Sequence, residues 1–234
     1  MKVVVIIDDK STSDVIRARH GLSLLFEKEG FTILFDMGPD EESLKENMRV
    51  LGIDASRIDV AVISHPHSDH YGGFKHLSWE NPYIKVYIPY GMMDSLGRML
   101  RSHDMIPVEV TKTTQLARDV LVAGPFHGPP VEQYLVFNMG DELLIATGCL
   151  HPGVETLEKV ASSLGRRIGV LIGGLHLRNA PEEVVKRTLD YVVGELGVAK
   201  LVPLHCIGRR ALEYLREKYS NVLVEAGAGS VIEF

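Results

Sequence analysis

The sequence predicts an α/β protein of two mixed β-sheets with helices on their outer faces, the arrangement of a sandwich. Two observations support this fold class. The first half of the chain is rich in short apolar, β-branched runs, and the second half alternates such runs with amphipathic segments of helical periodicity. The 234 residues, 45% of them hydrophobic, suffice for a sizeable core, and no linker is evident, so we expect a single domain over residues 1–234.

The first half opens with strands. Residues 21–28 and 31–36 flank Glu29-Gly30, which predicts a hairpin with glycine in its turn. Apolar residues recur at helical spacing from 40 to 51, and Gly52 follows as a C-terminal stop. The other elements expected in this half are strands over 2–7, 58–63, 84–88, 108–110 and 120–123, a short helical stretch ending at residue 77, and a helix over 92–100.

The second half begins with a segment, residues 124–132, whose proline and glycine content predicts a surface loop. A second hairpin is expected over 133–138 and 142–147. The elements that follow are helices over 154–164, 181–195 and 209–219, which alternate with strands over 168–172 and 200–204, and short strands over 222–224 and 231–234.

A cluster of metal-binding residue types follows the strand over 58–63. His65, His67, Asp69 and His70 fall within six residues, and Pro66 fixes the backbone between the first two histidines. Imidazole nitrogen and carboxylate oxygen are the donors that zinc and similar divalent ions prefer. The string therefore predicts a site for one or two divalent ions, with Zn²⁺ favoured and Mn²⁺ or Fe²⁺ as alternatives.

This HxHxDH string resembles the signature of the metallo-β-lactamase superfamily, and the resemblance extends over nearly the whole chain. It implies a four-layer αβ/βα sandwich in which two further histidines arrive from later strand ends. His151 and His205 occupy such places, each between an expected strand and an expected helix. The resemblance assigns one metal ion to His65, His67 and His151, and the other to Asp69, His70 and His205.

One residue of the superfamily pattern is missing. Most two-metal members carry a bridging aspartate on the strand between the last two histidines, but here residues 169–177 read GVLIGGLHL and contain no acid. His176 occupies that neighbourhood. It is expected either to replace the bridge or to contact the substrate, and substrate contact is favoured because an imidazole offers one lone pair where a carboxylate offers an oxygen to each ion.

Three further strings resemble one branch of the superfamily: residues 19–23 (RHGLS), 148–153 (GCLHPG) and 173–177 (GGLHL). The branch comprises 7,8-dihydropterin-6-methyl-4-(β-D-ribofuranosyl)aminobenzene-5'-phosphate synthases and relatives described as metal-dependent hydrolases. Membership would make His20 a further site residue.

The function expected from these residues is hydrolysis by a metal-bound water, with a phosphorylated or pterin-like small molecule as substrate. Asp69 would orient that water and act as the catalytic residue. Three alternatives stay open: a pterin-related transferase, a metal-binding sensor without turnover, and nucleophilic chemistry at Cys149 or Cys206.

The composition of the chain indicates which classes of binding partner to expect. A formal net charge of −6 and a pI near 5.9 argue against nucleic-acid binding, which leaves a small-molecule substrate. The apolar run at residues 3–7 is too short for a signal peptide or a membrane span, so we expect no membrane association and a cytoplasmic location with reduced cysteines. The oligomeric state is left open.

Overall fold

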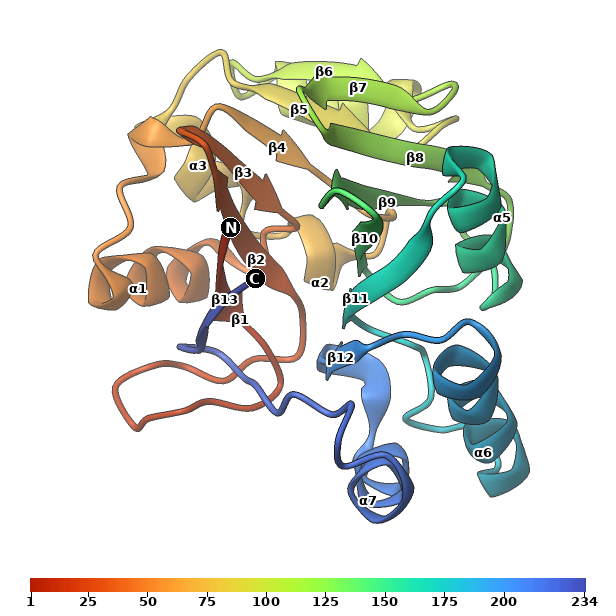
Figure 1. The fold of residues 1–234 in the computed structure, drawn as a ribbon. Coiled ribbons are helices and arrows are strands. Elements are labelled where there is room, and N and C mark those ends of the chain that lie inside the picture. Colours follow the sequence, from red (N-terminus) through yellow and green to blue (C-terminus); the bar gives the residue numbers. More distant parts are fainter. The chain divides into compact units, whose positions relative to one another are not determined.

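The computed structural model describes all residues from 1 to 234, and they form two compact units. The first unit comprises Met1–Lys112 and Ala226–Phe234, and the second comprises Thr113–Glu225. Each unit contains one mixed β-sheet with helices packed on it (Figure 1). The single domain expected over residues 1–234 stays a prediction.

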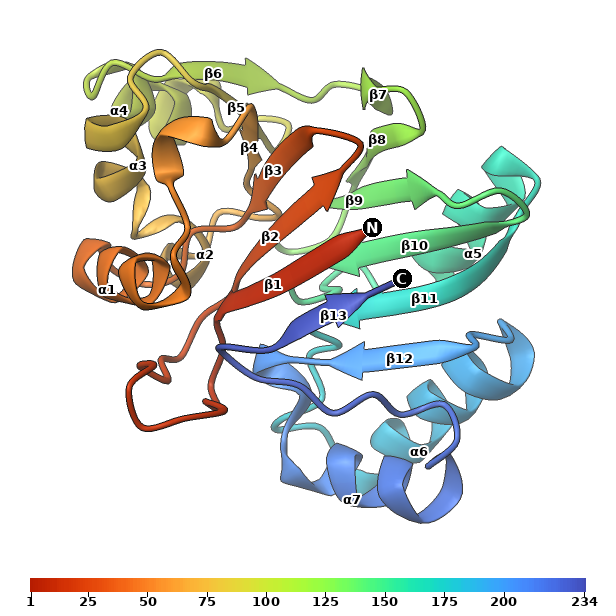
Figure 2. The same ribbon diagram turned by 60° about the vertical axis from the view of Figure 1, so that its left-hand side comes forward.

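The sheet of the first unit has the strand order β13-β1-β2-β3-β4-β5-β6. Strands β13, β1, β2 and β3 pair antiparallel, and β3 to β6 pair parallel, so the last strand of the chain lies beside the first (Figure 2). The strands are β1 (Lys2–Ile7), β2 (Ser23–Lys28), β3 (Phe31–Phe35), β4 (Val60–Val62), β5 (Lys85–Ile88), β6 (Ile106–Glu109) and β13 (Val231–Glu233).

The β2–β3 hairpin has the predicted turn. Glu29 and Gly30 both have positive φ, at 51° and 82°, as a two-residue turn matched to strand twist requires. The predicted helix is α1 (Glu41–Leu51), which begins where Asp40 accepts a hydrogen bond from the Ser43 amide and ends at Gly52 with φ of 67°.

The remaining helical segments of the first unit are short. The helix expected over 92–100 is a π-helical turn, η2 (Met93–Gly97), followed by α4 (Arg98–Arg101). The others are η1 (Ala55–Arg57), α2 (Ser68–Tyr71) and α3 (Phe74–Glu80). Leu44 and Leu77 are fully buried in one apolar cluster with sheet residues such as Leu34, so α1 and α3 cover this face of the sheet.

The sheet of the second unit has the order β12-β11-β10-β9-β8-β7, with β10, β11 and β12 parallel and the rest antiparallel. Its elements are β7 (Thr114–Ala117), β8 (Val120–Phe126), β9 (Glu132–Asn138), β10 (Glu142–Thr147), α5 (Glu155–Leu164), β11 (Arg167–Gly173), α6 (Glu182–Asp190), η3 (Tyr191–Glu195), β12 (Lys200–Pro203), η4 (His205–Ile207) and α7 (Arg209–Lys218). Leu157, Val185 and Leu212 bring α5, α6 and α7 into one buried cluster with this sheet (Figure 2).

Three expectations for this unit are wrong. The loop expected over 124–132 is shorter, because β8 continues through Gly124 and Pro125 and β9 begins at Glu132. A register shift between Ala123 and Phe126 accommodates the proline, which cannot donate a ladder hydrogen bond. Strand β7 was not expected, and residues 222–224 form only an isolated bridge from Leu223.

The parallel strands of the second unit determine where candidate site residues lie close together. Because β10, β11 and β12 run in one direction, the loops that follow them meet at a single edge of the sheet. Those loops carry His151, His176 and His205. None of the helices has the length and apolar character that crossing a bilayer requires.

Candidate metal centre

The first unit holds four of the predicted ligands at the end of β4 and in α2. The Nε2 atom of His65 lies 3.1 Å from Nδ1 of His67, and the ring centroids of His65 and His70 lie 4.1 Å apart. Nitrogen ligands of one tetrahedral zinc ion lie roughly 3.4 Å apart. The nitrogens of His65 and His67 are therefore close enough to ligate one metal ion, and the ring of His70 packs beside them.

A buried carboxylate sets the orientation of two of these rings. Asp36 Oδ2 accepts a hydrogen bond from Nδ1 of His70 at 2.6 Å and another from the Ser64 hydroxyl at 2.7 Å. Because the Ser64 hydroxyl donates its only proton to Asp36, its oxygen accepts a hydrogen bond from Nδ1–H of His65, at 2.9 Å. Both imidazoles then carry their proton on Nδ1 and their lone pair on Nε2, the form that ligates metals.

Asp36 was not identified as a site residue from the sequence. It is fully buried, with φ of 59°, and the sequence signal was an acid at the end of an apolar strand, which was assigned to the strand itself. Burial of a carboxylate is unfavourable unless its oxygens accept hydrogen bonds, and Asp36 also accepts the Ser64 amide at 2.7 Å.

His20 lies beside this cluster, as the branch resemblance implied. Its Nε2 is 3.6 Å from Asp69 Oδ2, and its Nδ1 is 3.1 Å from Asp9 Oδ2. Asp69 Oδ2 also lies 3.8 Å from Nε2 of His70. The neighbouring Gly21 leaves no room for a side chain, since a Cβ would meet the Asp69 carbonyl and Pro39. The His20 segment thus approaches Asp69 closely because of that glycine.

The second unit gathers a second cluster from the loops after β10, β11 and β12. The potential ligand atoms of Cys149, His176 and Cys206 all lie within 4.8 Å of one another, and the rings of His151 and His176 are 4.4 Å apart. Both cysteines and His205 are buried, whereas His176 is exposed. His176 and His205 have positive φ, at 52° and 51°, a strained conformation for these residues that the loops impose.

Glu132 holds the loop after β10 in place. Its buried carboxylate accepts the backbone amides of Gly148, Cys149 and Leu150 on Oε1, at 3.1, 2.9 and 2.9 Å, and that of His151 on Oε2 at 2.7 Å. Sequence reasoning had placed Glu132 in a surface loop. The signal that could have identified it is a single charge at the start of the apolar run 134–137.

The pKa values of Cys206 and His176 are shifted by their neighbours. A hydrogen bond with Cys149 is the largest cause of a lowered pKa at Cys206, followed by one with His176. In return, the hydrogen bond with Cys206 raises the pKa of His176. The loops can approach this closely because Gly174 has no side chain, since a Cβ there would meet Cys206 Sγ and the Gly148 carbonyl.

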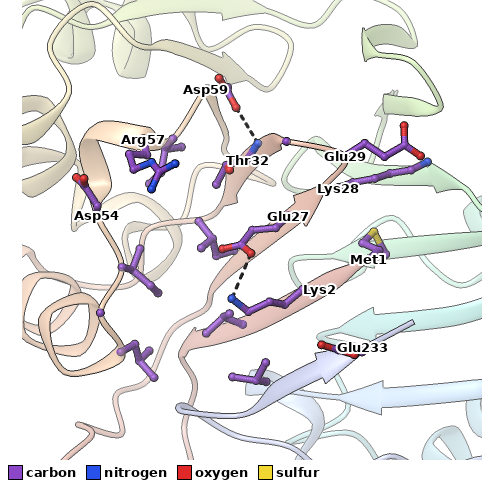
Figure 3. A pocket seen from close by; sticks show the side chains of 18 residues that line it. Met1, Lys2, Glu27, Lys28, Glu29, Thr32, Asp54, Arg57, Asp59 and Glu233 are labelled. Atoms are coloured by element: carbon purple, nitrogen blue, oxygen red, sulfur yellow. Dashed lines mark hydrogen bonds and ion pairs between the residues drawn. The ribbon is translucent and has the colours of Figure 1, made fainter.

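A cavity lies on each of the two units. A depression of about 970 Å³ on the first unit is lined by β1, β2, β13 and the chain after α1, with charges of both signs such as Lys2, Glu27 and Arg57 (Figure 3). None of the predicted ligands lines it. A smaller cavity of about 300 Å³ in the second unit is lined by His176 and by residues of α5, α6 and η3. The six predicted ligands line neither cavity, but the smaller one includes His176, the residue expected to contact the substrate.

The fold and the histidine clusters define a class of protein. The model of the metallo-beta-lactamase superfamily matches residues 16–156, more than half of the chain, and the protein belongs to this superfamily. Members typically bind divalent metal ions, and most are enzymes. The predicted fold class, with two mixed sheets and their helices, is confirmed.

More particular similarities agree with the predicted branch. The chain is 26% identical to the 7,8-dihydropterin-6-methyl-4-(beta-D-ribofuranosyl)-aminobenzene-5'-phosphate synthase of Methanocaldococcus jannaschii, over 93% of this chain and 90% of that protein. It is also 26% identical to an uncharacterized protein of the same organism, over 98% and 99%. The crystal structure of Tm1679, a metal-dependent hydrolase of the beta-lactamase superfamily, matches with a TM-score of 0.85 and 25% identity, over 100% of this chain and 99% of that one.

Proposed function

We propose that this protein is a metal-dependent hydrolase that acts on a phosphorylated or pterin-like small molecule. The observation that carries the proposal is the buried Asp36–Ser64 network, which fixes Nε2 as the ligating nitrogen of His65 and His70. We further propose Zn²⁺ as the ion, with Mn²⁺ or Fe²⁺ as alternatives, because the proposed donors are imidazole and carboxylate.

The residues proposed to hold metal come from both clusters: His65, His67, Asp69 and His70 in the first unit, and His151 and His205 in the second. A divalent ion bound by such residues supplies Lewis acidity and an activated water. Asp69 would orient the attacking water and accept its proton. His20, whose Nε2 lies 3.6 Å from Asp69 Oδ2 and whose Nδ1 lies 3.1 Å from Asp9 Oδ2, would take up that proton after a small approach to Asp69.

The cavity beside His176 supports a planar ring as part of the substrate. Leu150, Leu177 and Val184 supply apolar walls, and about 300 Å³ is at the lower end of small-molecule sites. One acid, Glu155, and one base, Arg187, also line it. Because these charges balance, the cavity suits a neutral heteroaromatic ring with donors and acceptors on its edge better than it suits a phosphate group.

A second candidate function is the synthase reaction of the curated relative. The match extends over 93% of this chain, and that relative's name contains a dihydropterin and an aminobenzene, both of which are planar rings. The same cavity would serve either reaction. Hydrolysis of simple esters, phosphodiesters or lactones supports the hydrolase, whereas metal-dependent product formation from a dihydropterin and a ribofuranosyl-aminobenzene phosphate supports the synthase.

The test combines metal content with turnover. His67→Ala should lose most of the bound metal, because removal of one of three imidazoles leaves an incomplete ligand shell. His103→Ala should keep its metal. Asp69→Asn should retain at least one ion, yet lose activity. Unchanged metal content in His67→Ala would refute the ligand assignment. Wild-type protein that binds metal but turns over none of these substrates would instead favour a metal-binding sensor.

A further inference from the structure

Cys149 lies at the centre of the donor atoms of the second unit. Its Sγ is within 4.8 Å of a ligand atom of His151, and also within 4.8 Å of one of His205. The ligand atoms of His176 and Cys206 lie within the same distance of it. Donors of one zinc ion are separated by roughly 3.3–3.8 Å, so a movement of no more than about 1.5 Å brings this sulfur and either histidine to the spacing of ligands on one ion.

The loop around Cys149 is held rigidly enough for ligation. The side chain is only 3% exposed, and its amide donates to Glu132 Oε1 at 2.9 Å. The amides of Leu150 and His151 donate to the same carboxylate. Glu132 therefore fixes Cys149 and His151 together, as residues that support metal ligands do.

The chemistry of the missing bridge favours sulfur over imidazole. Two cations that share a ligand need an anionic donor with more than one available lone pair, and a thiolate provides both on one atom. His176 offers one lone pair, is exposed and lines the substrate cavity. Cys149 is buried and near both His151 and His205, which belong to different ions in the superfamily pattern.

We propose that Cys149 is a metal ligand, shared between the ion bound by His151 and the ion bound by His205, in the place of the absent bridging carboxylate. Metal binding displaces the thiol proton to solvent, so the net charge that the carboxylate would have supplied is kept. Cys206, which lies beside Cys149, stays outside the metal shell. This inference rests on the proposed function, because it requires that the histidines bind metal.

The experiment replaces the native metal with Co²⁺ under a non-thiol reductant and records absorption. A thiolate bound to Co²⁺ gives a charge-transfer band in the near ultraviolet, which imidazole and carboxylate do not give. We expect the band in wild-type protein and in Cys206→Ser. Cys149→Ser should lose the band and part of its cobalt, and melting of the metal-free variants controls for folding.

The outcomes separate the two proposals. Wild-type protein that takes up no cobalt overturns the proposed function and this inference with it. Cobalt uptake without the band, or a band lost in Cys206→Ser, overturns only the inference, and neither result depends on whether Cys149→Ser folds. A di-cobalt form whose ions give uncoupled electron paramagnetic resonance signals overturns the shared role, whereas coupled signals that vanish in Cys149→Ser support it.

Discussion

At the scale of single residues, two buried carboxylates outside the proposed ligand set hold several of the proposed ligands in position. Asp36 fixes the tautomers of His65 and His70, and Glu132 fixes the loop that carries His151. Each carboxylate is fully buried and accepts several hydrogen bonds, which offset the cost of removing it from water. Positioning residues of this kind explain how flexible imidazoles can present one defined nitrogen.

A single substitution at His176 tests whether this residue binds metal or contacts the substrate. Its exposed ring lines the cavity, so we expect His176→Ala to leave metal per chain near the wild-type value and to impair turnover or substrate affinity. Metal analysis measures the ions bound per chain, and steady-state kinetics measure turnover and substrate affinity. Loss of the second ion in His176→Ala would show that the imidazole is a ligand after all. The control is His103→Ala, because His103 is half-buried and is not among the proposed ligands.

At the scale of elements, the order of strands β10, β11 and β12 brings three loops to one edge of their sheet. Close packing here depends on Gly173 and Gly174: a Cβ at Gly173 would meet Thr147 at the end of β10, and one at Gly174 would meet Gly148 in the loop that follows. Backbone contacts therefore help to position these loops.

Glu132→Gln tests that positioning. The substitution keeps the shape of the side chain but removes the negative charge that accepts hydrogen bonds from four backbone amides. The NH₂ group of glutamine would also face backbone N–H groups, and two donors cannot form a hydrogen bond with each other. We expect the free energy of unfolding to fall by about 2 kcal/mol or more, and the melting temperature to fall by roughly 4–8 °C. Calorimetry of the metal-free protein measures both quantities, and Glu183→Gln, at an exposed position, is the control. An unchanged melting temperature would contradict the role given to Glu132.

The cavity between α5 and α6 gives a second test at this scale. Val184→Trp places a large ring among the lining residues, so we expect KM for a pterin-like substrate to rise at least tenfold with metal content unchanged. Lys186→Trp, on the exposed side of the same helix, should leave KM near the wild-type value. Equal kinetics in both variants would place the substrate elsewhere.

At the scale of the whole molecule, metal binding and folding are linked. Ligands that bind the native chain and not the unfolded one stabilise it, by about 2.7 kcal/mol at a hundredfold excess over Kd. A chelator should therefore lower the melting temperature of wild-type protein by roughly 5–10 °C. His67→Ala should show a much smaller shift. A melting temperature that is the same with and without chelator in both proteins would argue against a metal centre.

Much of this protein could be predicted from local sequence. The Glu29-Gly30 hairpin, the helix that ends at Gly52 and the ligand string from His65 to His70 all depend on residues close together in the chain. Turn chemistry, helical periodicity and ligand spacing are local properties, so one sequence suffices to identify them. The same strings were enough to predict the superfamily.

The tertiary structure decided the residues whose roles depend on partners far away in the chain. Asp36 meets His70 across 34 positions, and Glu132 meets His151 across 19. Cys149 gathers donors from loops that become neighbours only when three parallel strands align. The physical reason is that a buried carboxylate or thiol is defined by what surrounds it, and strand pairing brings those surroundings together.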